Sequence, residues 1–158
     1  MVTLCARIGW PDSLTGKLGA AVIKIAQPSR IYHTGLLLSD GWLYQARLSE
    51  GVHRIKTNVF DGSWDTLELG KWADEDHAYK YWQARVGNGY DLPGLVDWGL
   101  RRYALTLLDI RIRPGLQSPR NEFCSELTMG MLDYPDPVQY SPSATKRECV
   151  KRNRMELV

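Results

Sequence analysis

Residues 31–46 read IYHTGLLLSDGWLYQA and predict the β-hairpin from which the rest of the fold can be worked out. The apolar run Ile31–Leu38 predicts a strand, Ser39–Gly41 a turn, and Trp42–Ala46 the partner strand. This order is typical of an antiparallel sheet built from strands that follow one another along the chain.

Further strands are indicated on both sides of the hairpin by alternation or by short runs of strand-forming residues: Val2–Ile8, Val52–Ile55 and Thr66–Leu69. Helices are indicated by apolar residues at helical spacing in four segments: 14–25, 74–86, 92–100 and 123–131. A short β-meander in the first half, with most helices in the second, predicts an α+β fold.

The chain has 158 residues, 44% of them hydrophobic, and a formal net charge of +2. This length fits one domain, and the apolar content excludes a disordered or collagen-like chain. Three cysteines argue against a disulfide scaffold. Basic residues gather in 146–154, so we predict a domain over 1–143 and a basic C-terminal tail over 144–158.

The sequence shows no secretory signal and no apolar stretch of membrane-spanning length. A cytoplasmic protein is therefore expected, although delivery by a phage or a secretion system would leave no mark here. The histidines are scattered and no phosphate-binding glycine loop occurs, so neither a metal nor another cofactor is expected. The nearly neutral charge predicts no nucleic-acid partner, and nothing indicates a particular oligomeric state.

Cys124 stands at the predicted start of the helix 123–131, followed by Ser125. Unpaired N–H groups and the helix dipole at such a position favour a thiolate and can also hold an oxyanion. Free cysteine is also among the most buried residue types. Position alone therefore leaves two interpretations open, a nucleophile and a structural core residue.

His33 interrupts the apolar strand 31–38, and Gln45 lies in the partner strand. Strand pairing can bring the two together, so that the Gln45 carbonyl oxygen accepts the imidazole N–H and fixes its tautomer. Gly35 leaves its strand face open to another backbone or to a substrate. Structural roles for His33 and Gln45 remain as alternatives at this point.

Two blocks of the sequence resemble the permuted papain-like hydrolases. The first is SRIYHTGL (29–36) with DGWLYQA (40–46) and Gly51-Val52, and the second is GYD (89–91) with FCSEL (123–127). The blocks and their spacing, which cover 2–143, are similar to those of the NlpC-like cysteine peptidases and amidases, relatives of the lecithin–retinol acyltransferases.

The resemblance implies a small antiparallel β-barrel or sheet packed on helices, in a circularly permuted papain-like arrangement. It implies Cys124 as nucleophile, His33 as general base and then acid, and Gln45 as the orienting residue. Tyr90, Tyr32 and Ser125 would line the site or bind substrate. The third position in such families is often Glu or His, and a neutral amide stabilises imidazolium less than a carboxylate does.

The resulting hypothesis is a cysteine hydrolase that cleaves an amide, in a peptide or a cell-wall peptide, or an acyl ester. Its substrate would be peptide-like or acyl, held as a covalent thioacyl-enzyme. One alternative is a catalytically inactive binding or phage accessory protein on the same fold. Another is a nucleic-acid-binding protein using the basic tail, which requires salt-dependent binding.

Overall fold

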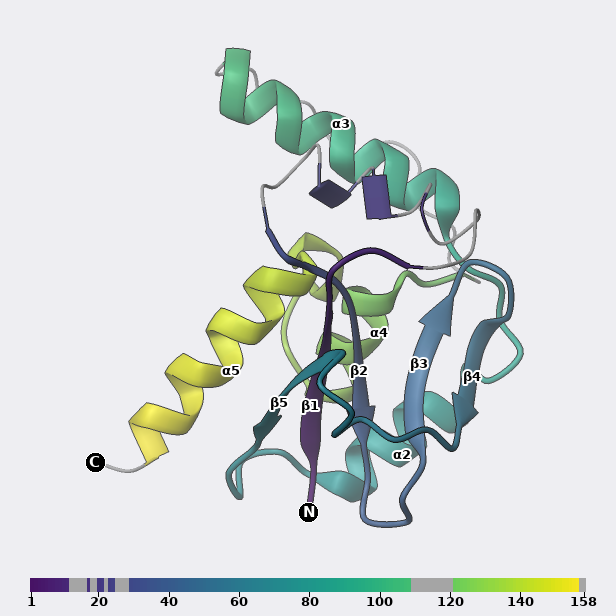
Figure 1. Cartoon of the computed structure of the whole chain (residues 1–158), viewed down its shortest axis with the longest axis vertical. Helices are drawn as coiled ribbons and strands as arrows, with labels where there is room; N and C mark the ends of the chain where they lie inside the picture. The colour runs from purple at the N-terminus through teal and green to yellow at the C-terminus, as the bar shows by residue number, and fades with distance from the viewer. Residues whose placement is uncertain (12–16, 18–19, 22, 25–28, 109–120, 157–158) are drawn as a thin grey trace.

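The computed structural model describes residues 1–11, 17, 20–21, 23–24, 29–108 and 121–156 (Figure 1). Its sheet has five antiparallel strands in the order β4-β3-β2-β1-β5. The strands are β1 (Thr3–Ile8), β2 (Ile31–Leu37), β3 (Leu43–Arg47), β4 (Gly51–Ile55) and β5 (Trp64–Glu68). Each predicted strand is present, and the α+β class is confirmed. Because β4 and β5 are the two edges, the described strands form an open sheet rather than a closed barrel.

The hairpin of β2 and β3 pairs Gly35 with Gln45. A Cβ on Gly35 would lie 2.8 Å from the Tyr44 carbonyl oxygen and 3.2 Å from Gln45 Cβ. Real Cβ atoms do not come this close to backbone, so the approach of β3 requires glycine here. β3 and the base of the Gln45 side chain fill the space beside Gly35. Of the two neighbours that the sequence predicts for this glycine, another backbone or a substrate, the structure shows the backbone.

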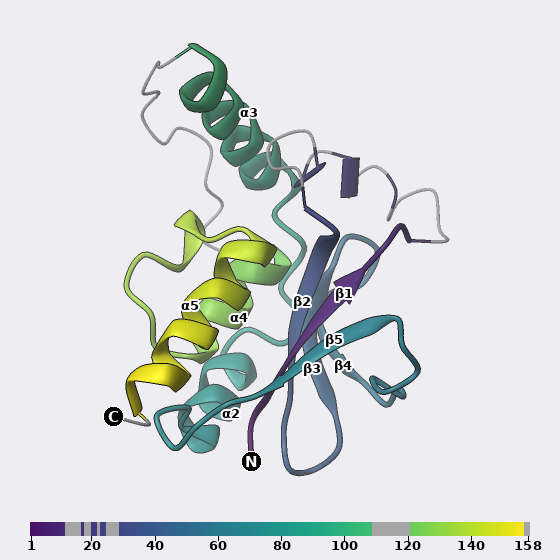
Figure 2. The same cartoon turned by 60° about the vertical axis from the view of Figure 1, so that its left-hand side comes forward.

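Three helices, α2 (Glu75–Gln83), α4 (Cys124–Met131) and α5 (Pro142–Glu156), lie on one side of the sheet (Figure 2). The helix α3 (Leu92–Leu108) extends beyond the end of the sheet, and a short 3-10 turn, η1 (Pro137–Gln139), follows α4. The predictions of α2, α3 and α4 are confirmed, with ends that differ by a few residues.

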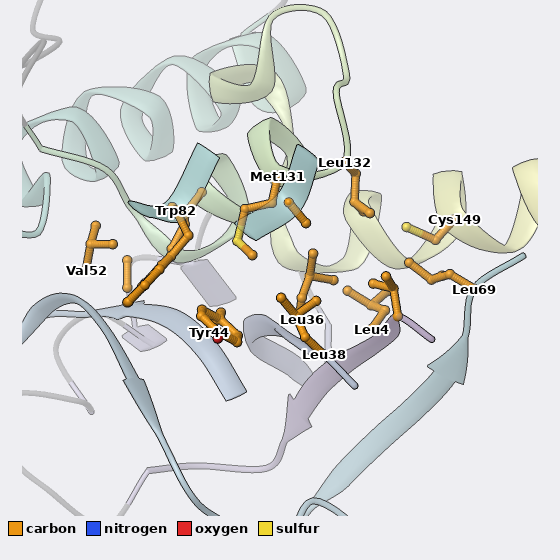
Figure 3. Close-up of a cluster of buried hydrophobic side chains, with 14 residues drawn as sticks. Leu4, Leu36, Leu38, Tyr44, Val52, Leu69, Trp82, Met131, Leu132 and Cys149 are labelled. Carbon is orange, nitrogen blue, oxygen red and sulfur yellow. The ribbon is translucent and has the colours of Figure 1, made fainter. Parts of the chain in front are cut away.

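The main core lies between the sheet and these helices (Figure 3). Leu36 and Tyr44 from the sheet are fully buried there with Leu127 and Met131 of α4. A polar contact crosses the same layer, because the Thr128 hydroxyl lies 3.2 Å from the Thr34 hydroxyl. The even-numbered residues of β2 therefore face α4, as the two-residue period of a strand requires.

The opposite face of the sheet carries a smaller cluster, formed by Cys5, Leu43, Val59 and Trp64. His33 belongs to this face, since its ring contacts Trp64 edge-on with a centroid distance of 5.9 Å. The two faces of β2 thus differ in character. One is an apolar core under helices, and the other combines a small apolar cluster with polar side chains.

The segment predicted as a basic tail, 144–158, lies mostly in α5. This helix buries Thr145 and Cys149 against the rest of the fold, and its Lys146 pairs with Asp65 of β5. Asn153 accepts hydrogen bonds from Gly70 N–H and Trp72 Nε1 and donates one to the Glu68 carbonyl. The boundary at 143 therefore separates no structural parts, because the basic face of α5 is the outer side of a packed helix.

Two predictions concern residues outside those described, at least in large part: the helix over 14–25 and the loop over 111–121. Among the helices that the structure describes, none combines the length and the apolar character needed to span a membrane.

Candidate active site

His33 and Gln45 are joined by a hydrogen bond of 2.7 Å between His33 Nε2 and Gln45 Oε1. Gln45 stands opposite Gly35, two residues along β2 from His33, so its side chain reaches diagonally between the strands. Both side chains are buried. An amide oxygen only accepts, so the ring proton of His33 lies on Nε2 and Nδ1 carries the lone pair. The predicted pairing of these two residues is present in the structure.

Burial lowers the pKa of His33 to about 4, and the charges of Arg47 and Arg7 act in the same direction. The hydrogen bond that His33 donates to Gln45 opposes this shift but does not cancel it. The imidazole is therefore neutral near pH 7, which is the form that can accept a proton.

Cys124 is the first residue of α4 and is 1% exposed. Its thiol is surrounded by donors that favour the thiolate: the backbone N–H groups of Thr34 and Ser125 and the hydroxyls of Tyr90 and Thr34. The sequence signal for this position, a cysteine opening a helix, thus corresponds to a real cluster of donors around the sulfur atom.

The expected thiolate is nevertheless not favoured, because burial raises the pKa of Cys124 above the value of an ordinary thiol. Hydrogen bonds from the same donors lower the pKa, but they stabilise the thiolate by less free energy than the loss of water around a charged sulfur costs. Cys124 and His33 are therefore both neutral near pH 7 in this structure.

The sulfur of Cys124 lies against Thr34, the residue that follows His33 in β2. Thr34 faces α4, whereas His33 packs against Trp64. No hydrogen bond joins Cys124 to His33 among the residues described here. The structure forms the predicted His33–Gln45 pair, and it places the Cys124 thiol against Thr34, on the helix-facing side of β2 and not on the side of His33 and Gln45.

A small cavity of about 60 Å³ lies at this end of the sheet and is lined by Tyr32, His33 and Tyr90, together with Arg7 and Arg47. Tyr90 lines this cavity and is also one of the donors around Cys124, because its hydroxyl faces the thiol. Burial and the neighbouring Cys124 raise the pKa of Tyr90, which keeps its phenol protonated as a donor. Tyr32 and Tyr90 thus line the same cavity as His33.

Ser125 differs from the expectation of a side chain that lines the site. Its hydroxyl is buried and donates to the Tyr140 carbonyl at 2.7 Å, so only its backbone N–H faces the thiol. Asp91, the last residue of the GYD block, accepts the Gly94 N–H at 3.0 Å in the first turn of α3. It contributes to the start of that helix.

His53 of β4 contacts Gln45, the predicted orienting residue. β3 and β4 pair Gln45 with His53, and the Gln45 Nε2 lies 3.1 Å from His53 Nε2. The signal that identifies it is the register of the hairpin of β3 and β4, which pairs Arg47 with Gly51 and therefore Gln45 with His53. Sequence spacing without that register does not identify it.

A larger cavity of about 970 Å³ lies away from these residues, along α5. Its lining combines the apolar residues Ile31, Val150 and Met155 with basic side chains of α5. Within the described ranges there is no group of three side chains suited to hold a metal ion.

Comparison with protein-family models finds no matching family, and no curated protein matches the chain.

Proposed function

We propose that the protein is a cysteine hydrolase that cleaves an amide or acyl ester through a covalent thioacyl-enzyme. The observation that carries the proposal is the His33–Gln45 hydrogen bond on β2 and β3, together with a cysteine thiol at the start of α4 that lies against Thr34, the residue after His33. An imidazole with its proton held on Nε2 has a basic Nδ1, which is what a thiol nucleophile requires.

The two neutral groups favour general-base catalysis over a preformed ion pair. Nδ1 of His33 takes the thiol proton as Cys124 Sγ attacks the substrate carbonyl carbon. The carbonyl π electrons move to oxygen, and N–H groups in the first turn of α4 and the Tyr90 hydroxyl stabilise the oxyanion. When the oxyanion collapses, the imidazolium protonates the leaving amine or alcohol, and the thioester remains.

Deacylation repeats these steps with water. Nδ1 of His33 takes a proton from water, the hydroxyl oxygen attacks the thioester carbon, and the bond to sulfur breaks. The imidazolium returns its proton to the sulfur, and a carboxylic acid leaves. A peptide amide, including one in a cell-wall peptide, is the first substrate class to test, followed by an acyl ester.

The test is labelling of the whole chain with a dipeptide acyloxymethyl ketone near pH 7, read by peptide mass spectrometry. We expect Cys124 to be alkylated in the wild type, and both Cys124→Ala and His33→Ala to abolish this labelling while keeping a cooperative unfolding transition. Cys149→Ala removes another buried thiol and should leave labelling unchanged. Equal labelling of wild type and Cys124→Ala would refute the assignment of the nucleophile.

A second candidate, a non-catalytic binding protein on the same fold, is favoured by one observation: Cys124 is buried and its thiol pKa is raised. The pH dependence of alkylation by iodoacetamide separates the two. A hydrolase predicts a Cys124 reaction that depends on His33 near neutral pH. A binding protein predicts a reaction that rises only at alkaline pH and is the same in His33→Ala.

A further inference from the structure

The hydrogen bonds of the His33–Gln45 pair continue to a third residue, His53. Gln45 lies between two imidazoles, with Oε1 at 2.7 Å from His33 Nε2 and its Nε2 at 3.1 Å from His53 Nε2. The other ring nitrogen of His53, Nδ1, lies 2.9 Å from the Gly51 carbonyl oxygen. The result is a row of three side chains across β2, β3 and β4 that ends on a backbone carbonyl.

In the neutral form of His53, the carbonyl at the end of this row sets the protons along it. A carbonyl oxygen only accepts, so Nδ1 of His53 carries the hydrogen, and in the neutral ring Nε2 is then an acceptor. That acceptor takes an N–H of the Gln45 amide, which turns the amide oxygen toward His33. The oxygen accepts the His33 Nε2–H, and the lone pair of His33 is left on Nδ1.

We infer that His53 is a positioning residue: by holding the Gln45 amide in one orientation, it selects the His33 tautomer whose Nδ1 is basic. The use of this tautomer in catalysis rests on the proposed function, whereas the selection itself does not. If the amide turned over, its N–H would face His33 Nε2, and the proton would move to Nδ1. His33 would then carry an N–H on Nδ1 instead of a lone pair.

Glu50 and Arg47 are the charged groups next to His53. Glu50 Oε2 lies 2.7 Å from His53 Nε2, and Glu50 Oε1 lies 3.6 Å from an Arg47 guanidinium nitrogen. A carboxylate can share a hydrogen bond with Nε2 only if His53 carries a second proton, and that proton would take the acceptor away from Gln45. Glu50 and Gln45 thus compete for Nε2, and His53 positions Gln45 in its neutral form, with the carboxylate turned away from the ring.

The experiment is long-range ¹H–¹⁵N correlation NMR of the imidazole nitrogens at pH 7.5, on the full chain labelled at histidine. We expect His33 as the Nε2–H tautomer and His53 as the Nδ1–H tautomer in the wild type. A wild type with His53 protonated at Nε2, or with His33 protonated at Nδ1, would overturn the inference without any variant having to fold.

The variants are His53→Ala, which removes the acceptor, and His53→Gln, which restores a side-chain oxygen in the same direction. His53→Ala should give a mixture of His33 tautomers and lower the labelling rate of Cys124 roughly ten- to a hundredfold. His53→Gln should recover both. His77→Ala is the matched control, since that ring contacts the Gly130 carbonyl on α4 and not the row.

The two proposals fail in different ways. An unchanged His33 tautomer in His53→Ala refutes the role of His53, whatever happens to labelling. The expected tautomers in a protein whose Cys124 never reacts refute the hydrolase and leave the positioning role intact.

Discussion

The two faces of the sheet are built from the same strands and differ in the side chains that they bury. Toward the helices, Leu36 and Tyr44 fill a continuous apolar core. On the other face, His33 and Gln45 satisfy each other by a hydrogen bond beside the smaller cluster around Trp64. Alternate residues of one hairpin can therefore serve stability and site geometry separately, because neighbouring side chains point to opposite faces.

The largest expected loss of stability concerns neighbouring leucines on β2, whose side chains point to opposite faces of the sheet. Leu36→Ala leaves a cavity between the sheet and α4 and should lower the free energy of unfolding by about 2–5 kcal/mol. Leu37→Ala, on the other face and only partly buried, should cost clearly less. Urea unfolding of both variants measures the difference, and equal losses would show that the two faces contribute alike.

The second prediction concerns the buried imidazole. Burial lowers the pKa of His33 to about 4, below the ordinary value of 6.5, so the unfolded chain binds a proton that the folded protein does not. Stability from this group is therefore present above about pH 6.5 and is lost as the pH falls toward 4, by up to about 3 kcal/mol. Unfolding of wild type and His33→Asn at several pH values isolates the contribution. Parallel pH profiles of the two proteins would contradict it.

Gly35→Ala changes a residue on the sheet face that carries His33 and Gln45. The added Cβ meets the Tyr44 carbonyl oxygen and Gln45 Cβ, and we expect a loss of about 1–3 kcal/mol with a weakened His33–Gln45 hydrogen bond. The side-chain amide signal of Gln45 in NMR reports that bond. Gly35 has no positive φ, so the loss reports the clash and not backbone strain.

The smallest effect is expected at the edge of the helical layer. Asp74 accepts the N–H groups of Asp76 and His77 and caps α2, so Asp74→Ala should cost about 1 kcal/mol without changing Cys124 reactivity. Thermal unfolding of Asp74→Ala and of Asp76→Ala, which keeps the cap, measures it. A larger loss in Asp76→Ala would contradict the assignment of the cap.

The sequence predicts the hairpin and the His33–Gln45 contact well, because both depend on local register across a short turn. It also places Cys124 at the start of a helix. It does not predict the raised pKa of the thiol, since burial of Cys124 arises from the packing of α4 on β2. Propensity and spacing carry no information about the water that this packing excludes.

The other differences have the same origin. A segment rich in basic residues, 144–156, is read from sequence as a solvated tail, but a few small residues such as Thr145 and Cys149 are enough to dock it as α5. His53 reaches Gln45 only through the pairing of β3 with β4. Contacts between elements decide each of these cases.

The Asn153 contacts bear on self-association. They tie α5 to the chain at the end of β5, an edge strand of the sheet. A chain shortened after residue 143 would lose this cover and the Lys146–Asp65 ion pair together. The Glu68 carbonyl and Gly70 N–H would then be open to another chain, and exposed strand edges are templates for such pairing. We therefore expect α5 to limit pairing of this sheet edge with a second chain.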